Sequence, residues 1–405
     1  ISYLRKCPQL SGLLCCSSTQ WSGLLRCSSN HTLTSTATPP TGLVLHIPPR
    51  VLRSAMHPSP RFFVVFLVLT VLAYAPGAAI ALAKDVEDTP SAASVCPSFS
   101  RPAEPCTSVW NMQPSQVDIV LALGDSITAA FGAKGRRGGF HESRGLSWSI
   151  GGDEGATTLP NFIKQYNPNL TGYSLGSRET SLCWGPVCRD VHRQRHDHLN
   201  GALSGSTIRN VWLDQLDYLE DQMITMGINE ESWKVLTLFV GANDLCICCK
   251  LPKRMAATEY SNTFRRVLEE IRDRFPRTLV SVVEMFNVSA IYRATENKAY
   301  CKDVHRLIFL ECDCAFKGSE SASEPYRQLM DELAQEYNKE MRNVIRDLSK
   351  VKNDTFAIAL HTFTRDLNIT SFPLEMISVS CTVSTRPYST RRLLTALLIP
   401  TCLTS

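Results

Sequence analysis

The sequence predicts an α/β fold with a central parallel sheet that helices cover on both faces. Two observations lead to this prediction: continuous apolar runs of strand length recur along the chain, and apolar stripes at helical spacing lie between them. A strand that is buried on both faces of a parallel sheet has a continuous apolar sequence instead of an alternating one. Such strands, when they alternate with helices, form a parallel sheet that is covered on both sides.

Four apolar runs are predicted to be strands of this sheet. The first covers residues 117–123 (VDIVLAL), and the others cover 235–240 (VLTLFV), 278–283 (TLVSVV) and 356–360 (FAIAL). Ligands of open parallel sheets bind beyond the carboxyl ends of the strands. The polar segments that follow the first two runs are therefore expected to contribute to a functional site.

Helices are predicted between the runs, because apolar residues recur there at spacings of three and four. The first stripe stops at Gly227 and the second at Pro276, and both residue types end helices. The three stripes are expected to be core faces. They comprise Leu213, Leu216, Leu219, Met223 and Met226; Tyr260, Phe264, Leu268, Ile271 and Phe275; and Tyr326, Leu329, Leu333, Tyr337, Met341, Val344 and Leu348.

The N-terminal part of the chain is predicted to lie outside the folded domain. Residues 1–55 contain neither methionine nor acidic residues and are interpreted as an unstructured translated leader. Residues 56–83 have a basic start, an apolar run and a small-residue end, as in a cleaved secretory signal peptide; the alternative is a membrane anchor. We interpret residues 84–115 as a Pro- and Ser-rich linker, 116–375 as the folded domain and 376–405 as an aberrant tail.

Export through a signal peptide would make the protein secreted and extracellular, where cysteines oxidise. Ten of the 16 cysteines lie between Cys96 and Cys314 and are predicted to form disulfides, Cys96 and Cys106 by tethering the linker. The alternative for Cys246-x-x-Cys249 is a zinc site. The net charge of +4 is too small to indicate nucleic-acid binding. Glycosylation sequons in the mature region fit the same compartment: Asn169, Asn287, Asn353 and Asn368.

The tripeptide Gly124-Asp125-Ser126 follows the first predicted strand and is the first candidate for catalytic chemistry. A serine that opens a helix just past a strand end has its hydroxyl at the sheet edge and its N–H among the unpaired donors of the helix start. This placement suits a nucleophile. The alternative is a helix N-cap, for which Ser and Asp are preferred. The Gly-x-Ser-x-Gly elbow of the common hydrolase fold is absent from the sequence.

Two further segments are considered together with this tripeptide because of their order along the chain. Residues 200–205 (NGALSG) precede the first helical stripe, and Gly241-Ala242-Asn243-Asp244 follows the second predicted strand. The three segments together resemble the nucleophile, glycine and asparagine blocks of the GDSL, or SGNH, family of ester hydrolases. Residues 144–153 (RGLSWSIGGD) and the continuation to Cys246 and Cys249 are similar to the phospholipase B branch. The resemblance extends from about residue 117 to about residue 374.

The resemblance implies a flavodoxin-like, three-layer α/β sandwich that acts as a serine esterase with no metal and no cofactor. Ser126 would be the nucleophile, and its own N–H, the Gly205 N–H and the Asn243 amide would hold the oxyanion. Each such donor lowers the barrier by about 3 kcal/mol. Alternatively, Gly205 is an ordinary turn glycine and Asn243 stabilises a loop. The implied substrates are acyl esters of phospholipids or lysophospholipids at a membrane surface.

The general base of the reaction is missing from this sequence. In the family that the chain resembles, a histidine and its aspartate come from an Asp-x-x-His block after the last strand. Residues 376–405 contain no Asp, Glu, His or Lys. His361 follows the last predicted strand, but Ile358 stands where the aspartate would be. A second group of polar residues is interpreted as a solvated loop, with ligation as the alternative: His192, His196, Asp197 and His198.

The composition changes after Glu375, which we interpret as a frameshift or a retained intron. The fold is therefore expected to be incomplete at its C-terminal end, and the chain as written to be inactive or impaired. Two alternatives to a phospholipase B-like activity stay open. One is an esterase that acts on other acyl esters, such as glycan acetates, and the other is a non-catalytic lipid-binding protein.

Overall fold

The computed structural model describes residues 104–134, 141–180, 191–297 and 312–365. All of them belong to one compact unit, which extends over Asp85–Ser405. The predicted leader 1–55, signal peptide 56–83 and tail 376–405 lie outside the described residues. Among the helices that are described, none has the length and apolar character required to cross a membrane.

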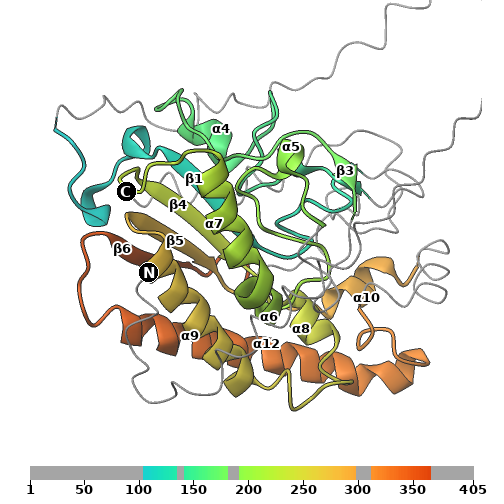
Figure 1. Cartoon of the computed structure of the whole chain (residues 1–405). Helices are drawn as coiled ribbons and strands as arrows, with labels where there is room; N and C mark the ends of the chain where they lie inside the picture. Colours follow the sequence, from blue (N-terminus) through green and yellow to red (C-terminus); the bar gives the residue numbers. More distant parts are fainter. Residues whose placement is uncertain (1–103, 135–140, 181–190, 298–311, 366–405) are drawn as a thin grey trace, which may run out of the picture. The chain divides into compact units, whose positions relative to one another are not determined.

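A four-stranded parallel sheet forms the centre of the fold (Figure 1). Its strands lie in the order β1 (Ile119–Gly124), β4 (Lys234–Phe239), β5 (Thr278–Val283) and β6 (Phe356–His361). All four predicted strands are confirmed, and every residue of β1 and β4 is buried. The continuous apolar runs are thus explained by burial on both faces of the sheet.

The chain also runs parallel to the free side of β1, where it forms single bridges instead of a full strand. Thr171 pairs with Ile119, and Asn200 pairs with Ala122. The Ala122 N–H donates to Leu199 O, and the Gly201 N–H donates to Ala122 O. The segment that follows Asn200 therefore leaves the sheet at the same carboxyl edge as β1.

Long helices cover one face of the sheet. They are α7 (Leu216–Thr225), which continues a π-helical turn η6 (Val211–Gln215), α9 (Ala257–Arg274) and α12 (Glu320–Leu348). Their buried side chains form one cluster with residues of all four strands. The main contributors are Leu121, Leu236, Val280 and Phe356 from the strands and Leu219, Phe264, Ile271, Tyr337 and Met341 from the helices.

The opposite face carries a thinner layer of short helices and loops. Ile163 of α4 (Leu159–Ile163) packs with Val120 and Val235, and Val109 of η2 (Val109–Asn111) packs with Trp233 and Ala357. The prediction of a sheet covered on both faces is confirmed. The remaining elements are short: η3 (Pro114–Gln116), β2 (His141–Glu142), η4 (Arg144–Leu146), β3 (Arg178–Glu179), α5 (Gln194–Asp197), α6 (Ile208–Asn210), α8 (Ala242–Cys246) and α10 (Ala290–Thr295).

The predicted helical stripes are confirmed in part. All five members of the second stripe are buried in α9 or directly after it. In the first stripe Leu213 and Met226 are exposed. Leu213 lies in the π-helical turn, whose wider hydrogen-bond spacing shifts the helical phase relative to α7, and Met226 follows the last residue of α7. In the third stripe Leu329 is exposed, because the core face of α12 passes through the neighbouring Met330 instead.

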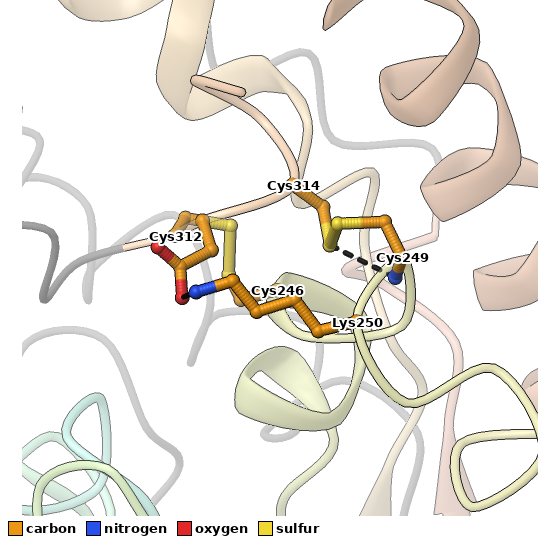
Figure 2. Close-up of a disulfide and its surroundings, with 6 residues drawn as sticks. Cys246, Cys249, Lys250, Cys312 and Cys314 are labelled. Carbon is orange, nitrogen blue, oxygen red and sulfur yellow. Dashed lines mark hydrogen bonds and ion pairs between the residues drawn. A yellow bond between two sulfur atoms is a disulfide. The ribbon is translucent and has the colours of Figure 1, made fainter. Parts of the chain in front are cut away.

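Two disulfides connect α8 to the segment that precedes α12 (Figure 2). Cys246 is bonded to Cys312, and Cys249 is bonded to Cys314. The predicted disulfides are confirmed for these four cysteines, whose sulfurs are thereby unavailable as zinc ligands. Cys106 was expected to tether the linker through a disulfide but is a free thiol, and Cys96 lies outside the described residues.

Candidate active site

Three loops leave the carboxyl edge of the sheet side by side. Gly124 ends β1 opposite Phe239 of β4, so that the loops that begin at Asp125 and at Gly241 start from adjacent strands. The loop after Asn200 starts on the other side of β1. The structure therefore brings the three predicted motif segments to one edge, as the parallel topology requires.

Side-chain hydrogen bonds join the three loops into one unit. The Gln215 side chain accepts a hydrogen bond from the Gly124 N–H at 2.9 Å and donates to Gly124 O at 2.8 Å. It also donates to Ser206 Oγ at 3.1 Å. The Asn243 amide donates to Ser206 O at 2.9 Å. Ser206 is thus bonded to Asn243 directly and to the end of β1 through Gln215.

Ser126 lies in a turn and not at the start of a helix, which corrects the prediction made from the sequence. The Asp125 carboxylate accepts the Ile127 N–H at 3.0 Å, and the Ala129 N–H donates to Asp125 O at 2.9 Å, so that a single helix-like turn forms after Asp125. The turn then ends at Ala130, whose φ of 59° is left-handed. Because no helix follows, Ser126 is not a helix N-cap, and its side chain stays partly exposed.

Gly205 occupies the third position of the turn Leu203–Ser206. The turn is closed by a hydrogen bond of 3.2 Å from the Ser206 N–H to Leu203 O, and Gly205 has a φ of 86°. A type II turn requires a positive φ at this position, which explains the glycine. Gly205 is therefore a turn glycine, and this backbone conformation does not conflict with a role for its N–H in binding.

The three predicted oxyanion donors retain free hydrogen-bonding capacity. Within the described part of the chain, no protein group accepts a hydrogen bond from the backbone N–H of Ser126 or Gly205. The amide of Asn243 has two N–H donors, and the bond to Ser206 uses one of them. Three donors from three adjoining loops are thus available to a bound anion at the sheet edge.

Two buried carboxyl groups belong to these loops, and their burial could not be inferred from the sequence. The Asp244 carboxylate accepts a hydrogen bond from the Ile208 N–H at 3.1 Å, and the Asp125 carboxylate accepts one from the Ile127 N–H at 3.0 Å. Burial raises the pKa of each carboxyl group to about 7. The negative charge of Asp125 adds to the rise in the pKa of Asp244. Asp244 thus connects its own loop to the start of α6.

His361 does not lie beside Ser126. It ends β6, which β4 and β5 separate from β1. Three strand spacings correspond to roughly 14 Å, which is too far for direct proton transfer. Burial lowers the pKa of His361, which favours the neutral imidazole.

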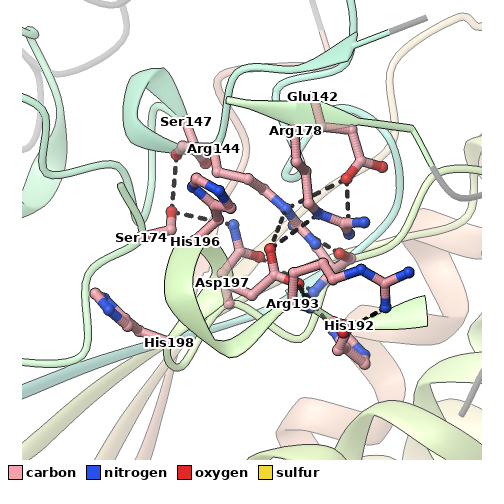
Figure 3. Close-up of polar contacts among 12 residues, drawn as sticks. Glu142, Arg144, Ser147, Ser174, Arg178, His192, Arg193, His196, Asp197 and His198 are labelled. Atoms are coloured by element: carbon pink, nitrogen blue, oxygen red, sulfur yellow. Dashed lines mark hydrogen bonds and ion pairs between the residues drawn. The ribbon is translucent and has the colours of Figure 1, made fainter. Parts of the chain in front are cut away.

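The cluster around Asp197 is buried, which contradicts its interpretation as a solvated loop (Figure 3). The Asp197 carboxylate pairs with Arg144 at 2.9 Å and with Arg178 at 3.0 Å, and His192 Nδ1 lies 3.4 Å from it. Burial opposes the charge of Asp197, but the guanidinium of Arg144 and other donors outweigh it and lower the pKa to about 2. The arginines occupy the carboxylate, so this group does not suit a metal cation.

Gln215 is the main site residue that sequence reasoning missed. It stands directly before Leu216 in the first helical stripe, where a buried polar side chain is unusual. It also lies in the π-helical turn, and such turns occur frequently at functional sites. The polar residue inside an apolar stripe was the available signal.

Comparisons with known proteins were consistent with this geometry. Residues 120–374 match the family described as GDSL-like Lipase/Acylhydrolase. The human protein "Phospholipase B1, membrane-associated" is 36% identical over 47% of this chain and 13% of its own length, and the rat protein of that name is 29% identical over 69% and 18%. The chain thus spans less than a fifth of the length of these relatives. The crystal structure of an extracellular lipase from Streptomyces rimosus aligns with 64% of this chain and 91% of its own, at 14% identity and a TM-score of 0.28.

Proposed function

This chain belongs to the GDSL-like lipase/acylhydrolase family, and from that premise we propose that it is a serine esterase of phospholipids and lysophospholipids. The observation that carries the proposal is the arrangement of Ser126, Gly205 and Asn243 on three hydrogen-bonded loops at one sheet edge. A nucleophile beside preorganised donors is what ester hydrolysis requires.

In the proposed mechanism, Ser126 Oγ attacks the ester carbonyl carbon and its proton passes to a base. The carbonyl oxygen becomes an oxyanion, which accepts hydrogen bonds from the N–H groups of Ser126 and Gly205 and from the Asn243 amide. The alcohol then leaves with a proton, and water hydrolyses the acyl-serine to free fatty acid and serine. These donors act where charge develops, so they stabilise the transition state more than the substrate.

The proton of Ser126 has no assigned acceptor in the sequence as written. His361 lies across the sheet, and His192 belongs to the buried cluster around Asp197. No Asp-x-x-His block follows Glu375. We therefore propose that the chain as written reacts slowly and that a supplied base would accelerate it.

The proposed substrate class and compartment have separate support. The relatives' name, phospholipase B1, favours a lipid ester as substrate and a membrane surface as the place of reaction. Export is supported by the two disulfides, since such bonds persist in oxidising compartments. Asn169 and Asn287 are exposed, as acceptors of glycans must be. We retain residues 56–83 as the proposed signal peptide and 116–375 as the proposed hydrolase domain.

Hydrolysis of lysophosphatidylcholine micelles, with and without added imidazole as an external base, tests this proposal. We expect slow release of fatty acid, an increase of at least about tenfold with imidazole, and no increase for Ser126→Ala. Release of acetate from acetylated glycans, with no release from lipid, would show an esterase of another substrate class. Binding of the micelles without any release that depends on Ser126 would show a lipid-binding protein and would contradict the proposed activity.

A further inference from the structure

Four charged side chains form a buried network between the antiparallel strands β2 and β3 and the loop that carries Gly205. Glu142 pairs with Arg178 at 2.8 Å and with Arg144 at 3.3 Å, and both arginines pair with Asp197. The side chains of Glu142, Arg144 and Asp197 have no exposed surface. Figure 3 shows the two carboxylates on either side of the two guanidinium groups. We call these four residues the charge network.

The charge network has no net charge, and His192 packs beside it. Two carboxylates face two guanidinium groups, and His192 adds no charge because burial lowers its pKa to about 4. The His192 ring stacks on Tyr218 with the ring centroids 3.5 Å apart. Ion pairing of the four charges reduces the large cost of burying an isolated ion. The network therefore keeps these side chains buried next to one another.

The charge network contacts the Gly205 loop at two points. Arg144 donates a hydrogen bond to Ala202 O at 2.7 Å. Glu142 Oε1 accepts one from Ser204 Oγ at 2.6 Å and one from the Ser204 N–H at 3.3 Å. Glu142 therefore uses one carboxylate oxygen for the loop and the other for the arginines.

The contact with Ser204 restrains the peptide unit that carries the Gly205 N–H. The carbonyl of Ser204 and the N–H of Gly205 belong to one planar peptide unit. Glu142 binds both the hydroxyl and the backbone N–H of Ser204. Rotation of the peptide unit between Ser204 and Gly205 is therefore restricted at its N-terminal end. The turn bond from the Ser206 N–H to Leu203 O restricts it at the other end.

We propose that Ser204 and Glu142 are positioning residues for the oxyanion donor of Gly205. This inference rests on the proposed function, and it extends it to residues that do not touch the substrate. A buried ion network of this kind is seldom more stable than well-packed apolar residues. Its specific consequence is a fixed orientation for the Gly205 peptide, since a preorganised donor needs no reorientation when the oxyanion forms.

Ser204→Ala tests the inference, because it removes one hydroxyl and leaves all four charges paired. We expect labelling of Ser126 by a long-chain fluorophosphonate to fall about tenfold, since the oxyanion donor is displaced but not removed. Ser204→Thr, which keeps the hydroxyl, should recover most of the rate. Binding of palmitate, a product that has no tetrahedral centre, should stay within about twofold of the unaltered protein.

The matched control is Thr278→Val at the start of β5. The Thr278 hydroxyl is also buried and donates to Phe275 O at 2.8 Å, but it lies at the amino end of the sheet. We expect this variant to lose stability in urea without a specific loss of labelling. Equal labelling by Ser204→Ala and Thr278→Val after correction for the folded fraction would overturn the inference.

A measurement of the Gly205 amide separates this inference from the proposed function. In protein labelled with ¹⁵N-glycine, Ser204→Ala should shift or broaden the Gly205 amide resonance, whereas Thr278→Val should leave it in place. If fluorophosphonate does not label Ser126 in the unaltered protein even with added imidazole, the proposed function fails while the resonance still reports on the positioning. An unchanged Gly205 resonance in Ser204→Ala would overturn the positioning role by itself.

Discussion

Asp125 and Asp244 show how single buried residues of the motifs also support the loops. The Asp244 carboxylate accepts the Ile208 N–H at the start of α6, and the Asp125 carboxylate accepts the Ile127 N–H of its own turn. Neither carboxylate has a partner of opposite charge at hydrogen-bond distance among the described residues that would compensate for its burial. The motif residues therefore connect the loops but make the stability of the site sensitive to pH.

Asp244→Asn should flatten the pH dependence of folding stability. The pKa of Asp244 is about 7 in the folded chain and about 4 in an unfolded one, so the folded state holds the proton between these values. Stability is therefore fully present below pH 4 and is lost as the pH rises through 7. Urea unfolding should show a loss of about 2 kcal/mol per carboxyl group from pH 5 to pH 7.5.

Asparagine preserves an acceptor for the Ile208 N–H but does not titrate, so Asp244→Asn should lose less stability over this pH range. The control is Asp221→Asn on the exposed surface of α7, which should keep the slope of the unaltered protein. A variant Asp244→Asn with an unchanged slope would contradict the assignment of the pH dependence to this carboxyl group.

At the scale of elements, the short helix α8 depends on covalent support. It has 5 residues, which is far below the length at which a helix is stable alone. Asn243 lies in its first turn and Cys246 at its end, where the disulfide to Cys312 begins. The Cys314 N–H also donates to Cys246 O at 2.9 Å. The disulfides thus hold the helix that carries Asn243, the proposed oxyanion donor.

Replacement of all four cysteines of the two disulfides by alanine should destabilise the protein by about 4 kcal/mol. The two bonds close nearly the same loop, with sequence separations of 66 and 65 residues, so the unfolded chain regains its freedom only when both are lost. Urea unfolding under oxidising conditions measures the change. Cys106→Ser, which alters a free thiol, should remain within about 0.5 kcal/mol. Equal midpoints for the two variants would show that the disulfides do not support the fold.

At the scale of the whole molecule, the sheet and the placement of the three motif loops could be predicted from the sequence. Strands buried on both faces have an unmistakable apolar pattern, and parallel topology brings their carboxyl ends to one edge. The π-helical turn before α7 and the single turn after Asp125 could not be predicted, because they depend on tertiary hydrogen bonds and on the Asp125 side chain.

The charge network could not be predicted for a different reason. Glu142 and Arg144 are close in sequence, but Arg178 and Asp197 lie much further along the chain, and Asp197 lies in a segment with the composition of an exposed loop. Only the fold shows that Arg144 and Arg178 neutralise this loop and allow its burial. Sequence pattern identifies residues that are close along a helix or strand, but it does not identify partners that meet through loops.

The central claim is that Ser126, Gly205 and Asn243 form one esterase site, and fluorophosphonate labelling tests it most directly. After incubation with the probe and with added imidazole as the external base, peptide mass spectrometry should find the adduct on Ser126. The adduct should be absent from Ser126→Ala, and its rate of formation should fall by at least about tenfold in Asn243→Ala, since each oxyanion donor contributes about 3 kcal/mol. Labelling at another residue, or a rate that does not change in Asn243→Ala, would contradict the account.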